Sequence, residues 1–292
     1  MRISEWIEKN TASLLLRTVA VSGSTGGLGR ELCFYFAGLG ASLVLVDRNP
    51  EKSRALGCEI RKRYPDTEIR HVVADMEKIE DVRAAADELL ALDIDHLVLN
   101  AGAYSIPRHK CDTGYDNVFQ INFVSPYYLA KRLLPHIREK GGKVVAVGSI
   151  AHNYSVTDPE DVDFSTRKKA SKVYGNAKRY LMFSLSELSG GDLSVSLTHP
   201  GITFTNITAH YPKPIFAIIK YPMKLIFMKP RRAALCILRG VFEDCGRNEW
   251  IGPRFFGIWG GPRRKRLNTC KAEEAERIFA EAERIISELC DK

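Results

Sequence analysis

The chain has 292 residues, of which 45% are hydrophobic, and it carries a formal net charge of +8. This amount of apolar material is enough for the core of one large domain. No uncharged apolar run reaches the length of about 18 residues that a membrane-spanning helix needs, which argues against an integral membrane protein.

Seven cysteines are scattered along the chain, and none of them forms a Cys-x-x-Cys pair. An odd number without such pairs argues against a disulfide framework and against a zinc site, so we expect no bound metal. Residues 1–10 interrupt their apolar positions with Glu5, Glu8 and Lys9, unlike a signal peptide. These features fit a protein of the reducing cytoplasm.

Positive charge is concentrated in the C-terminal third of the chain. The segment between Asp192 and Glu243 contains lysines and arginines but no acidic residue, which makes it the first basic region. Residues 263–266 form a second basic cluster, Arg-Arg-Lys-Arg. A solvated basic face, an anionic membrane surface or a phosphate-bearing substrate would each account for this charge. We expect no nucleic-acid partner, because no recognised binding module accompanies the charge.

An apolar run at residues 19–21, a glycine-rich segment and an amphipathic run at residues 30–40 predict a strand, a tight turn and a helix. Backbone amides at such a helix N-terminus favour negative charge, and glycines let the pyrophosphate of a dinucleotide come close. Glycine turns also join strands to helices without any ligand. The turn residues that would contact a dinucleotide are Gly23, Ser24, Thr25, Gly27, Leu28 and Gly29.

A carboxylate closes the next apolar run, residues 42–46. This residue, Asp47, lies 18 residues after Gly29, which places it to accept hydrogen bonds from the adenosine ribose hydroxyls. The spacing favours NAD as the cofactor. NADP remains open, because Arg48 could pair with a 2′-phosphate.

Apolar runs continue to alternate with helical patterns in the following residues, in the order helix 50–63, strand 69–74, helix 77–92 and strand 96–99. Such alternation predicts an α/β fold with a doubly wound parallel sheet, the Rossmann fold. Ligands of these sheets bind beyond the carboxyl ends of the strands. Asp75 and Asn100 fall there together with Gly23 and Asp47.

Three spaced motifs stand in one order along the chain: Ser22-Gly23-x-x-x-Gly27-x-Gly29, Asn100-Ala101-Gly102 and Tyr174-x-x-x-Lys178. In this combination the chain resembles the short-chain dehydrogenase/reductase family from about residue 18 to residue 205. The resemblance implies one Rossmann-fold domain over residues 1–292 and an NAD(P)-dependent oxidoreductase. It also implies a catalytic tetrad, which maps onto Asn122, Ser149, Tyr174 and Lys178.

The tyrosine and the lysine of this tetrad are four residues apart, so they share one helix face. Tyrosine titrates near pH ~10, and a nearby ammonium lowers that pKa, so we expect Lys178 to tune Tyr174. In the mechanism that the resemblance implies, Tyr174 exchanges a proton with the substrate oxygen while a hydride passes to or from nicotinamide. Ser149 holds that oxygen, Lys178 grips the nicotinamide ribose, and Asn122 holds a water that links the lysine to solvent.

Two departures from the family pattern stand out. Ser149 and Tyr174 are 25 residues apart, where many members have about a dozen; with Ser149-Ile-Ala-His152, this spacing resembles the retinol-dehydrogenase-like branch. The polar residues 153–171 are expected to form one rim of the substrate cleft. Ser125 replaces a usual glycine, which should tighten packing slightly.

The segment after the sixth strand, predicted at residues 194–197, matches the family element that lies against the nicotinamide carboxamide. Its residues are Pro200, Thr203 and Thr205, and Asp75, Asn100 and Gly102 complete the implied cofactor contacts. Residues 202–230 correspond to the family's helical substrate lid. Their apolar and aromatic content favours a lipophilic alcohol or ketone as the substrate, although a lid that packs on its own core would have the same composition. Interleaved lysines make peripheral membrane contact through the lid a second prediction.

The C-terminal region departs from the family's common end. Residues 249–251 are expected to form a seventh strand at the sheet edge, and the aromatic stretch 255–261 has no assignment. An apolar stripe over residues 273–289, within a tail at residues 271–291, predicts a helix that docks on the body or on a second subunit. Family members commonly assemble through the helices that carry the asparagine and the tyrosine, so we expect a homo-oligomer.

Two other functions compete with the oxidoreductase. A non-catalytic sensor or scaffold of the same fold would bind the dinucleotide without turnover; the intact tetrad argues against it. A nucleotide-sugar epimerase is disfavoured, because those relatives are usually longer and space their glycine turn differently.

Overall fold

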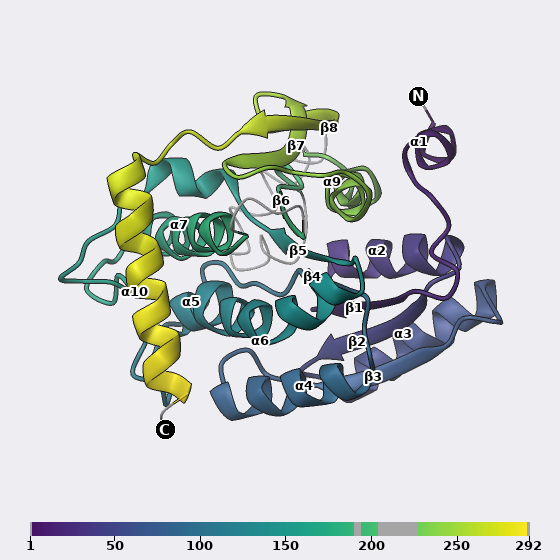
Figure 1. The fold of residues 1–292 in the computed structure, drawn as a ribbon, viewed down its shortest axis with the longest axis horizontal. Helices are drawn as coiled ribbons and strands as arrows, with labels where there is room; N and C mark the ends of the chain where they lie inside the picture. Colours follow the sequence, from purple (N-terminus) through teal and green to yellow (C-terminus); the bar gives the residue numbers. More distant parts are fainter. Residues whose placement is uncertain (1, 190–193, 204–226, 291–292) are drawn as a thin grey trace, which may run out of the picture.

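A computed structural model of the chain describes residues 2–189, 194–203 and 227–290. In this part of the chain, eight strands form one sheet in the order β3-β2-β1-β4-β5-β6-β7-β8, and all neighbours are parallel except β7 and β8 (Figure 1). The strands are β1 Thr18–Ser22, β2 Ser42–Asp47, β3 Ile69–Val73, β4 His96–Leu99, β5 Lys143–Val147, β6 Val195–Thr198, β7 Glu249–Phe255 and β8 Trp259–Arg266.

Helices cover both faces of the sheet. The main α-helices are α1 Ile3–Asn10, α2 Gly27–Gly38, α3 Pro50–Arg63, α4 Ile79–Ala91, α6 Ser125–Glu139, α7 Ala170–Leu188, α9 Pro230–Phe242 and α10 Ala272–Cys290. Three short helical turns are α5 Asn117–Phe119, the π-helix η1 Gln120–Val124 and the 3₁₀-helix η2 Ile150–Tyr154. The predicted α/β, doubly wound parallel sheet is confirmed, as a single domain.

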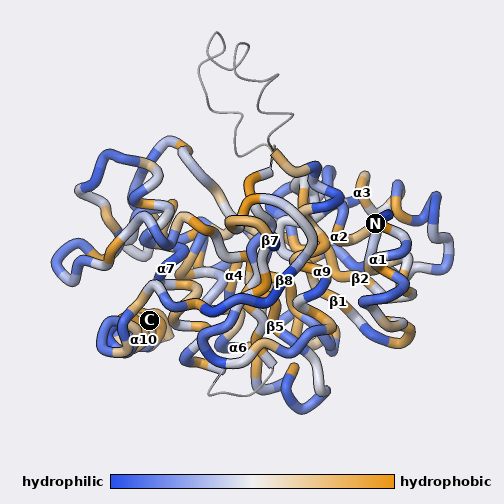
Figure 2. The backbone as a smooth tube through the Cα atoms, turned by 90° about the horizontal axis from the view of Figure 1, so that it is seen from above, coloured by the Kyte–Doolittle hydropathy of each residue, from blue (hydrophilic) through white to orange (hydrophobic). Residues whose placement is uncertain are grey.

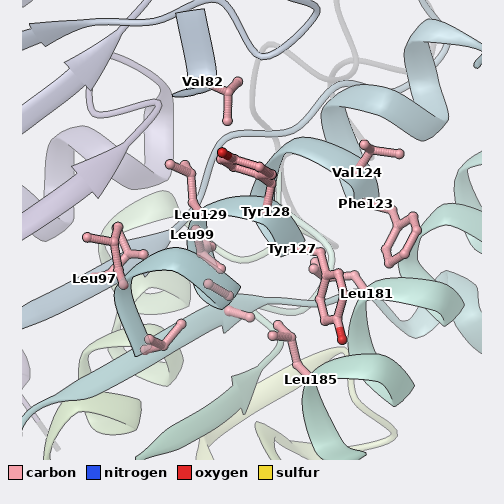
Figure 3. Packing of buried hydrophobic residues seen from close by; sticks show 14 of the residues in the cluster. Val82, Leu97, Leu99, Phe123, Val124, Tyr127, Tyr128, Leu129, Leu181 and Leu185 are labelled. Atoms are coloured by element: carbon pink, nitrogen blue, oxygen red, sulfur yellow. The ribbon is translucent and has the colours of Figure 1, made fainter. Parts of the chain in front are cut away.

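The two faces of the sheet bury two separate cores, because successive side chains of a strand point to opposite sides. In β1, Val19 and Val21 face the core under α2, α3 and α9, whereas Ala20 faces the core under α4, α6 and α7. Figure 3 shows the second core, where Phe123, Tyr127 and Leu181 pack together. Figure 2 shows hydrophobic residues along the central strands and hydrophilic residues on the outer loops.

The predictions for the first four strands agree with the structure to within one residue, and that for β6 is displaced by one residue. The predicted edge position of the strand at 249–251 is wrong, because β7 lies between β6 and β8. The unassigned aromatic stretch 255–261 runs from the end of β7 through the turn into β8, and β8 also contains the basic cluster Arg-Arg-Lys-Arg. Its glycines, proline and charges have low strand propensity, and only pairing with β7 makes the segment extended. Charged residues of this kind protect an exposed sheet edge from pairing with other chains.

Asn122 lies in the π-helix η1, which connects α5 to α6. The neighbouring Ser125 does tighten this region. Its Oγ donates a hydrogen bond of 2.7 Å to the carbonyl of Met76 and accepts one of 3.0 Å from Gln120 Nε2. A glycine at this position would make neither bond.

The C-terminal helix α10 docks on the body of its own chain, along α7 and η1. Glu283 accepts hydrogen bonds from the Tyr127 hydroxyl at 2.6 Å and from Lys131 Nζ at 2.7 Å. Arg179, which is buried, makes a two-pronged ion pair with Glu274, in which Nε–Oε1 and Nη2–Oε2 are both 2.8 Å. α10 therefore covers part of the helix face that we expected to form an interface between subunits. No helix in the described ranges is long and apolar enough to cross a bilayer.

The ion pair between Arg179 and Glu274 predicts a large mutational effect. Glu274→Ala leaves a buried guanidinium without its carboxylate, which should lower the free energy of unfolding by roughly 3 kcal/mol in urea denaturation. Glu276→Ala, an exposed glutamate on the same helix, is the matched control and should change the free energy by less than about 0.5 kcal/mol. Equal effects of the two substitutions would contradict the role of the pair.

Candidate active site

A cavity of about 790 Å³ opens at the carboxyl ends of β1, β2, β3 and β4. This edge of a parallel sheet is where the sequence placed the cofactor. Nine predicted cofactor residues line the cavity: Gly23, Thr25, Gly27, Leu28, Asp47, Arg48, Asp75, Asn100 and Gly102. The groove has the position and the residues for an extended dinucleotide.

Two glycines make the turn at the base of this cavity, each for a separate reason. Gly23 adopts a φ of +64°, the left-handed region that side chains rarely enter. Gly29 lies so close to the turn that a Cβ on it would stand 2.3 Å from the carbonyl oxygen of Gly23. α2 begins at Gly27, so its free amides face the cavity. This backbone fits the pyrophosphate of a dinucleotide.

The carboxylate of Asp47 is buried, and its hydrogen bonds go to the turn itself. Oδ1 accepts from the backbone amide of Thr25 at 3.0 Å and from the Thr25 hydroxyl at 2.9 Å, and Oδ2 accepts from the Ser24 hydroxyl. Ser24 thus supports the turn and does not line the cavity. Beside Asp47, Arg48 is exposed at the cavity wall.

The opposite side of the turn is braced by Asn100. Its Nδ2 donates hydrogen bonds of 3.0 Å to the carbonyls of Ser22 and Gly23, and its backbone amide donates to the Ser22 hydroxyl at 3.0 Å. The Asn100-Ala101-Gly102 motif therefore supports the glycine turn as well as lining the cavity.

Three members of the predicted tetrad lie around the end of β5. Ser149 follows β5, and its side chain is hydrogen-bonded to Tyr174 on α7. Lys178, one helical turn further, donates a hydrogen bond of 2.9 Å to the carbonyl of Val147 and lies over the Tyr174 ring, 5.7 Å from its centroid. The four-residue spacing thus brings both side chains to the same site.

The protonation of this pair differs from the prediction. Burial raises the pKa of Tyr174 to about 12, and the hydrogen bond with Ser149 only partly opposes this effect. Burial lowers the pKa of Lys178 to about 7. The prediction that Lys178 brings the Tyr174 pKa below its ordinary value is therefore wrong for this structure. The lysine amine lies over the ring, and loss of solvation dominates for both groups.

The fourth member, Asn122, reaches the site from η1. Its Nδ2 donates to the carbonyls of Ala103 and Val118, both at 2.8 Å, and Oδ1 accepts from the Ala103 amide at 3.3 Å. A Cβ on Gly102 would stand 2.8 Å from this Oδ1 and 3.7 Å from Lys178 Nζ. Asn122 and Lys178 therefore both face the bare backbone of Gly102.

Several predicted cofactor residues do not line the cavity in the described structure. Tyr174 and Lys178 are not among its lining residues, Pro200 is buried, and Thr203 pairs with Met228 in an isolated bridge. Thr205 and most of the lid predicted at 202–230 lie outside the described residues, and so does the membrane contact predicted for that lid.

Sequence reasoning missed one aromatic residue of the site. Tyr104 lines the cavity and meets Tyr174 edge to face, with ring centroids 5.3 Å apart. Its place two residues after the Asn-Ala-Gly motif was the available signal. Lys52, Met76 and Ile106 also line the cavity and were not predicted.

A model of the family described as short chain dehydrogenase matches residues 17–214. The chain belongs to the short-chain dehydrogenase family. This match agrees with the three motifs and with the geometry around Tyr174.

Curated relatives within the short-chain dehydrogenase family include proteins named as retinol dehydrogenases. The chain is 27% identical over 264 residues to "Retinol dehydrogenase 14" of Mus musculus, covering 82% of this chain and 77% of that protein. It is 25% identical to "Retinol dehydrogenase 13" of Homo sapiens, covering 66% of this chain and 61% of that protein. It is 28% identical to "Short-chain dehydrogenase TIC 32 A, chloroplastic" of Brassica napus, covering 66% of each. The chain thus spans slightly less than two thirds of the length of the latter two relatives.

Solved structures extend the likeness to nearly the whole chain. An uncharacterized protein from Mycobacterium Paratuberculosis superposes with a TM-score of 0.76 at 22% identity, covering 96% of both chains, and shows the same fold. A short-chain dehydrogenase from Sphingobium yanoikuyae, solved in complex with NADPH, superposes with a TM-score of 0.54 at 25% identity, covering 66% of this chain and 73% of that one.

Three buried histidines of this short-chain dehydrogenase predict acid sensitivity. Burial lowers the pKa of His96 and His152 to about 4 and that of His199 to about 3, from an ordinary 6.5. Between pH 6.5 and about 4 the unfolded chain binds protons that the folded chain excludes, so stability falls as pH falls. Each histidine should lower the free energy of unfolding, measured by urea denaturation, by roughly 1.4 kcal/mol for each pH unit of acidification in this range.

A substitution separates this effect from acid titration in general. His199→Gln should reduce the slope of the free energy of unfolding against pH by about one third, since it removes one of the three groups. If the free energy of unfolding stays unchanged on acidification to about pH 4.5, the three histidines are not held neutral by burial.

Proposed function

We propose that the protein is an NAD(P)-dependent oxidoreductase that transfers a hydride between nicotinamide and the carbonyl or alcohol carbon of an apolar small molecule. The observation that carries this proposal is the hydrogen-bonded pair of Ser149 and Tyr174, with Lys178 beside it, next to a cavity built for a dinucleotide. Bound nicotinamide would supply or accept the hydride.

The protein's own residues supply the proton and hold the substrate oxygen. A Tyr174 hydroxyl with a pKa near 12 stays protonated at neutral pH, so it can donate a proton to an oxygen that becomes an alkoxide. The Ser149 hydroxyl, already bonded to Tyr174, is placed to hold the same oxygen. Lys178, whose pKa lies near 7, can return a proton to the site. This arrangement favours carbonyl reduction.

Removal of the tyrosine hydroxyl tests the proposal. Tyr174→Phe should lower kcat by about 10²- to 10⁴-fold, because it removes the hydroxyl that donates the proton to the substrate oxygen. The measurement is the change in nicotinamide absorbance with a panel of ketones and aldehydes. Tyr180→Phe removes a buried hydroxyl from the same helix and should retain kcat. A Tyr174→Phe enzyme with full turnover would refute the assignment.

We further propose that the enzyme prefers NADP, against the preference for NAD inferred from the sequence. Both oxygens of Asp47 already accept hydrogen bonds from Ser24 and Thr25. The exposed Arg48 and the neighbouring Lys52 line the same part of the cavity. Two cations beside an occupied carboxylate favour a 2′-phosphate over two free hydroxyls.

Loss of the arginine tests this preference. Arg48→Ser should lower kcat/KM for NADPH by about 10- to 100-fold, since it removes a charge-assisted hydrogen bond to phosphate, and should leave kcat/KM for NADH nearly unchanged. Arg54→Ser, an exposed arginine further along α3, should change neither value. Equal losses with both cofactors would contradict the assignment.

An apolar substrate is the remaining part of the proposal. Two relatives carry the printed name retinol dehydrogenase. Tyr104 and Ile106 supply apolar surface to the cavity close to Tyr174. A flat lipophilic carbonyl would pack against the Tyr104 ring.

Cytoplasmic location and self-association also remain predictions. All seven cysteines are free thiols, which accords with a reducing compartment. A homo-oligomer that assembles through the α7 face would form beside or over α10, because that helix occupies part of this face.

A further inference from the structure

The tip of the β7–β8 hairpin exposes three large aromatic side chains. Phe255 is 53% exposed, Phe256 is 84% exposed and Trp259 is 40% exposed. Phe256 adopts a φ of +50°, so the turn holds its ring outward in a left-handed conformation that phenylalanine rarely adopts. Water contact of this much aromatic surface is unfavourable, and such patches mark interaction sites.

This tip lies at the edge of the sheet where the active site opens. β7 is parallel to β6, so its carboxyl end falls at the catalytic edge. The carbonyl of Gly257 in the turn accepts a hydrogen bond of 3.1 Å from His199 Nε2, and a Cβ on Gly257 would stand 3.2 Å from the side chain of Ile150, the residue after Ser149. The aromatic tip is therefore a neighbour of the catalytic serine loop.

A second exposed apolar segment follows β5 on the same edge. Tyr154 is 59% exposed and Val156 is 66% exposed. Lys172, near the start of α7, donates a hydrogen bond to the Tyr154 carbonyl and holds this segment against the helix. We call these five side chains the rim patch; its members are Tyr154, Val156, Phe255, Phe256 and Trp259.

The chain segments that carry the rim patch also carry exposed cations. The Arg254 guanidinium lies over the Phe255 ring, 5.4 Å from its centroid, and Lys168 and Lys169 are exposed just before α7. Among the residues that the structure describes, no carboxylate is paired with these three cations, whereas the nearby Asp158 is already paired with Arg167. The rim thus combines exposed aromatic surface with cations available to a ligand.

We propose that the rim patch docks the enzyme onto the surface of an anionic phospholipid bilayer. Aromatic side chains favour the boundary between headgroups and acyl chains, and lysine and arginine are attracted to anionic headgroups. A second copy of the chain fits this surface less well. In a two-fold interface Arg254 and the lysines would face their own copies, and like charges would oppose association.

Docking in this orientation turns the mouth of the active site toward the membrane. A lipophilic carbonyl dissolved in the bilayer would then enter the site without crossing water; this consequence rests on the proposed function, whereas the docking itself does not. The rim patch thereby deepens the proposed preference for apolar substrates.

Vesicle flotation with the full-length protein tests the docking. The probes are vesicles of phosphatidylcholine alone and of phosphatidylcholine mixed with phosphatidylserine, at low and physiological salt. The test variant is Phe255→Thr/Phe256→Asn, because asparagine tolerates a left-handed φ. The control is Leu15→Thr/Leu16→Asn, in the loop that precedes β1 at the opposite edge of the sheet. These two leucines are also adjacent and exposed, at 69% and 92%, and Leu16 has a φ of 63°. Thermal melting by circular dichroism checks that each variant folds.

We expect the wild-type protein and the control to bind the mixed vesicles and not the neutral ones, more tightly at low salt. The phenylalanine variant should bind about tenfold more weakly or worse. Absence of wild-type binding at low salt overturns the proposal, as does equal binding by the phenylalanine variant. Analytical ultracentrifugation of the phenylalanine variant covers the alternative. If the variant binds vesicles like the wild type but sediments as a smaller species, the rim patch is an interface between copies of the chain, and the proposal of membrane docking is overturned. None of these outcomes depends on turnover, so a failure of the proposed function remains distinguishable.

Discussion

The contact between Gly29 and the carbonyl of Gly23 is the constraint on which the site depends. Because glycine has no Cβ, α2 can begin directly behind the turn that follows β1. Asp47 from β2 and Asn100 from the end of β4 hold the same turn by hydrogen bonds from its two sides. Three strands thus converge on one stretch of backbone, and the cavity is preorganised because those strands are neighbours in the sheet.

The chemistry at the other end of the cavity follows from burial. Lys178 is buried and Tyr174 is partly buried, so the neutral forms of both are favoured, with the phenol protonated and the amine near its titration point at neutral pH. Such a pair suits proton donation to a carbonyl oxygen. Asn122 and Gly102 complete the wall, since the amide and the lysine amine approach the glycine backbone from one side.

The C-terminal third of the chain adapts this core to its surroundings. α10 covers α7 and secures it through Arg179 and Glu274, and β8 closes the sheet edge beside β7. The hairpin that joins β7 to β8 then carries aromatic residues to the catalytic edge. The C-terminal strands and helix therefore add to the central sheet and also form part of the surface beside the active site.

The sequence alone determined the central fold, because it depends on local patterns, whereas the tetrad residues came from the family resemblance. Continuous apolar runs define buried parallel strands, glycines define the turn, and a Tyr and a Lys four residues apart share a helix face whatever surrounds them. It could not place β8, since Gly-Gly-Pro-Arg-Arg-Lys-Arg has no strand pattern until β7 supplies a partner. It also misjudged the pKa of Tyr174, and it did not reveal that Ser24 and Thr25 donate hydrogen bonds to the Asp47 carboxylate. Solvation and hydrogen-bond partners are set by distant residues such as Val147, Ser24 and Thr25, which only the tertiary structure brings into contact.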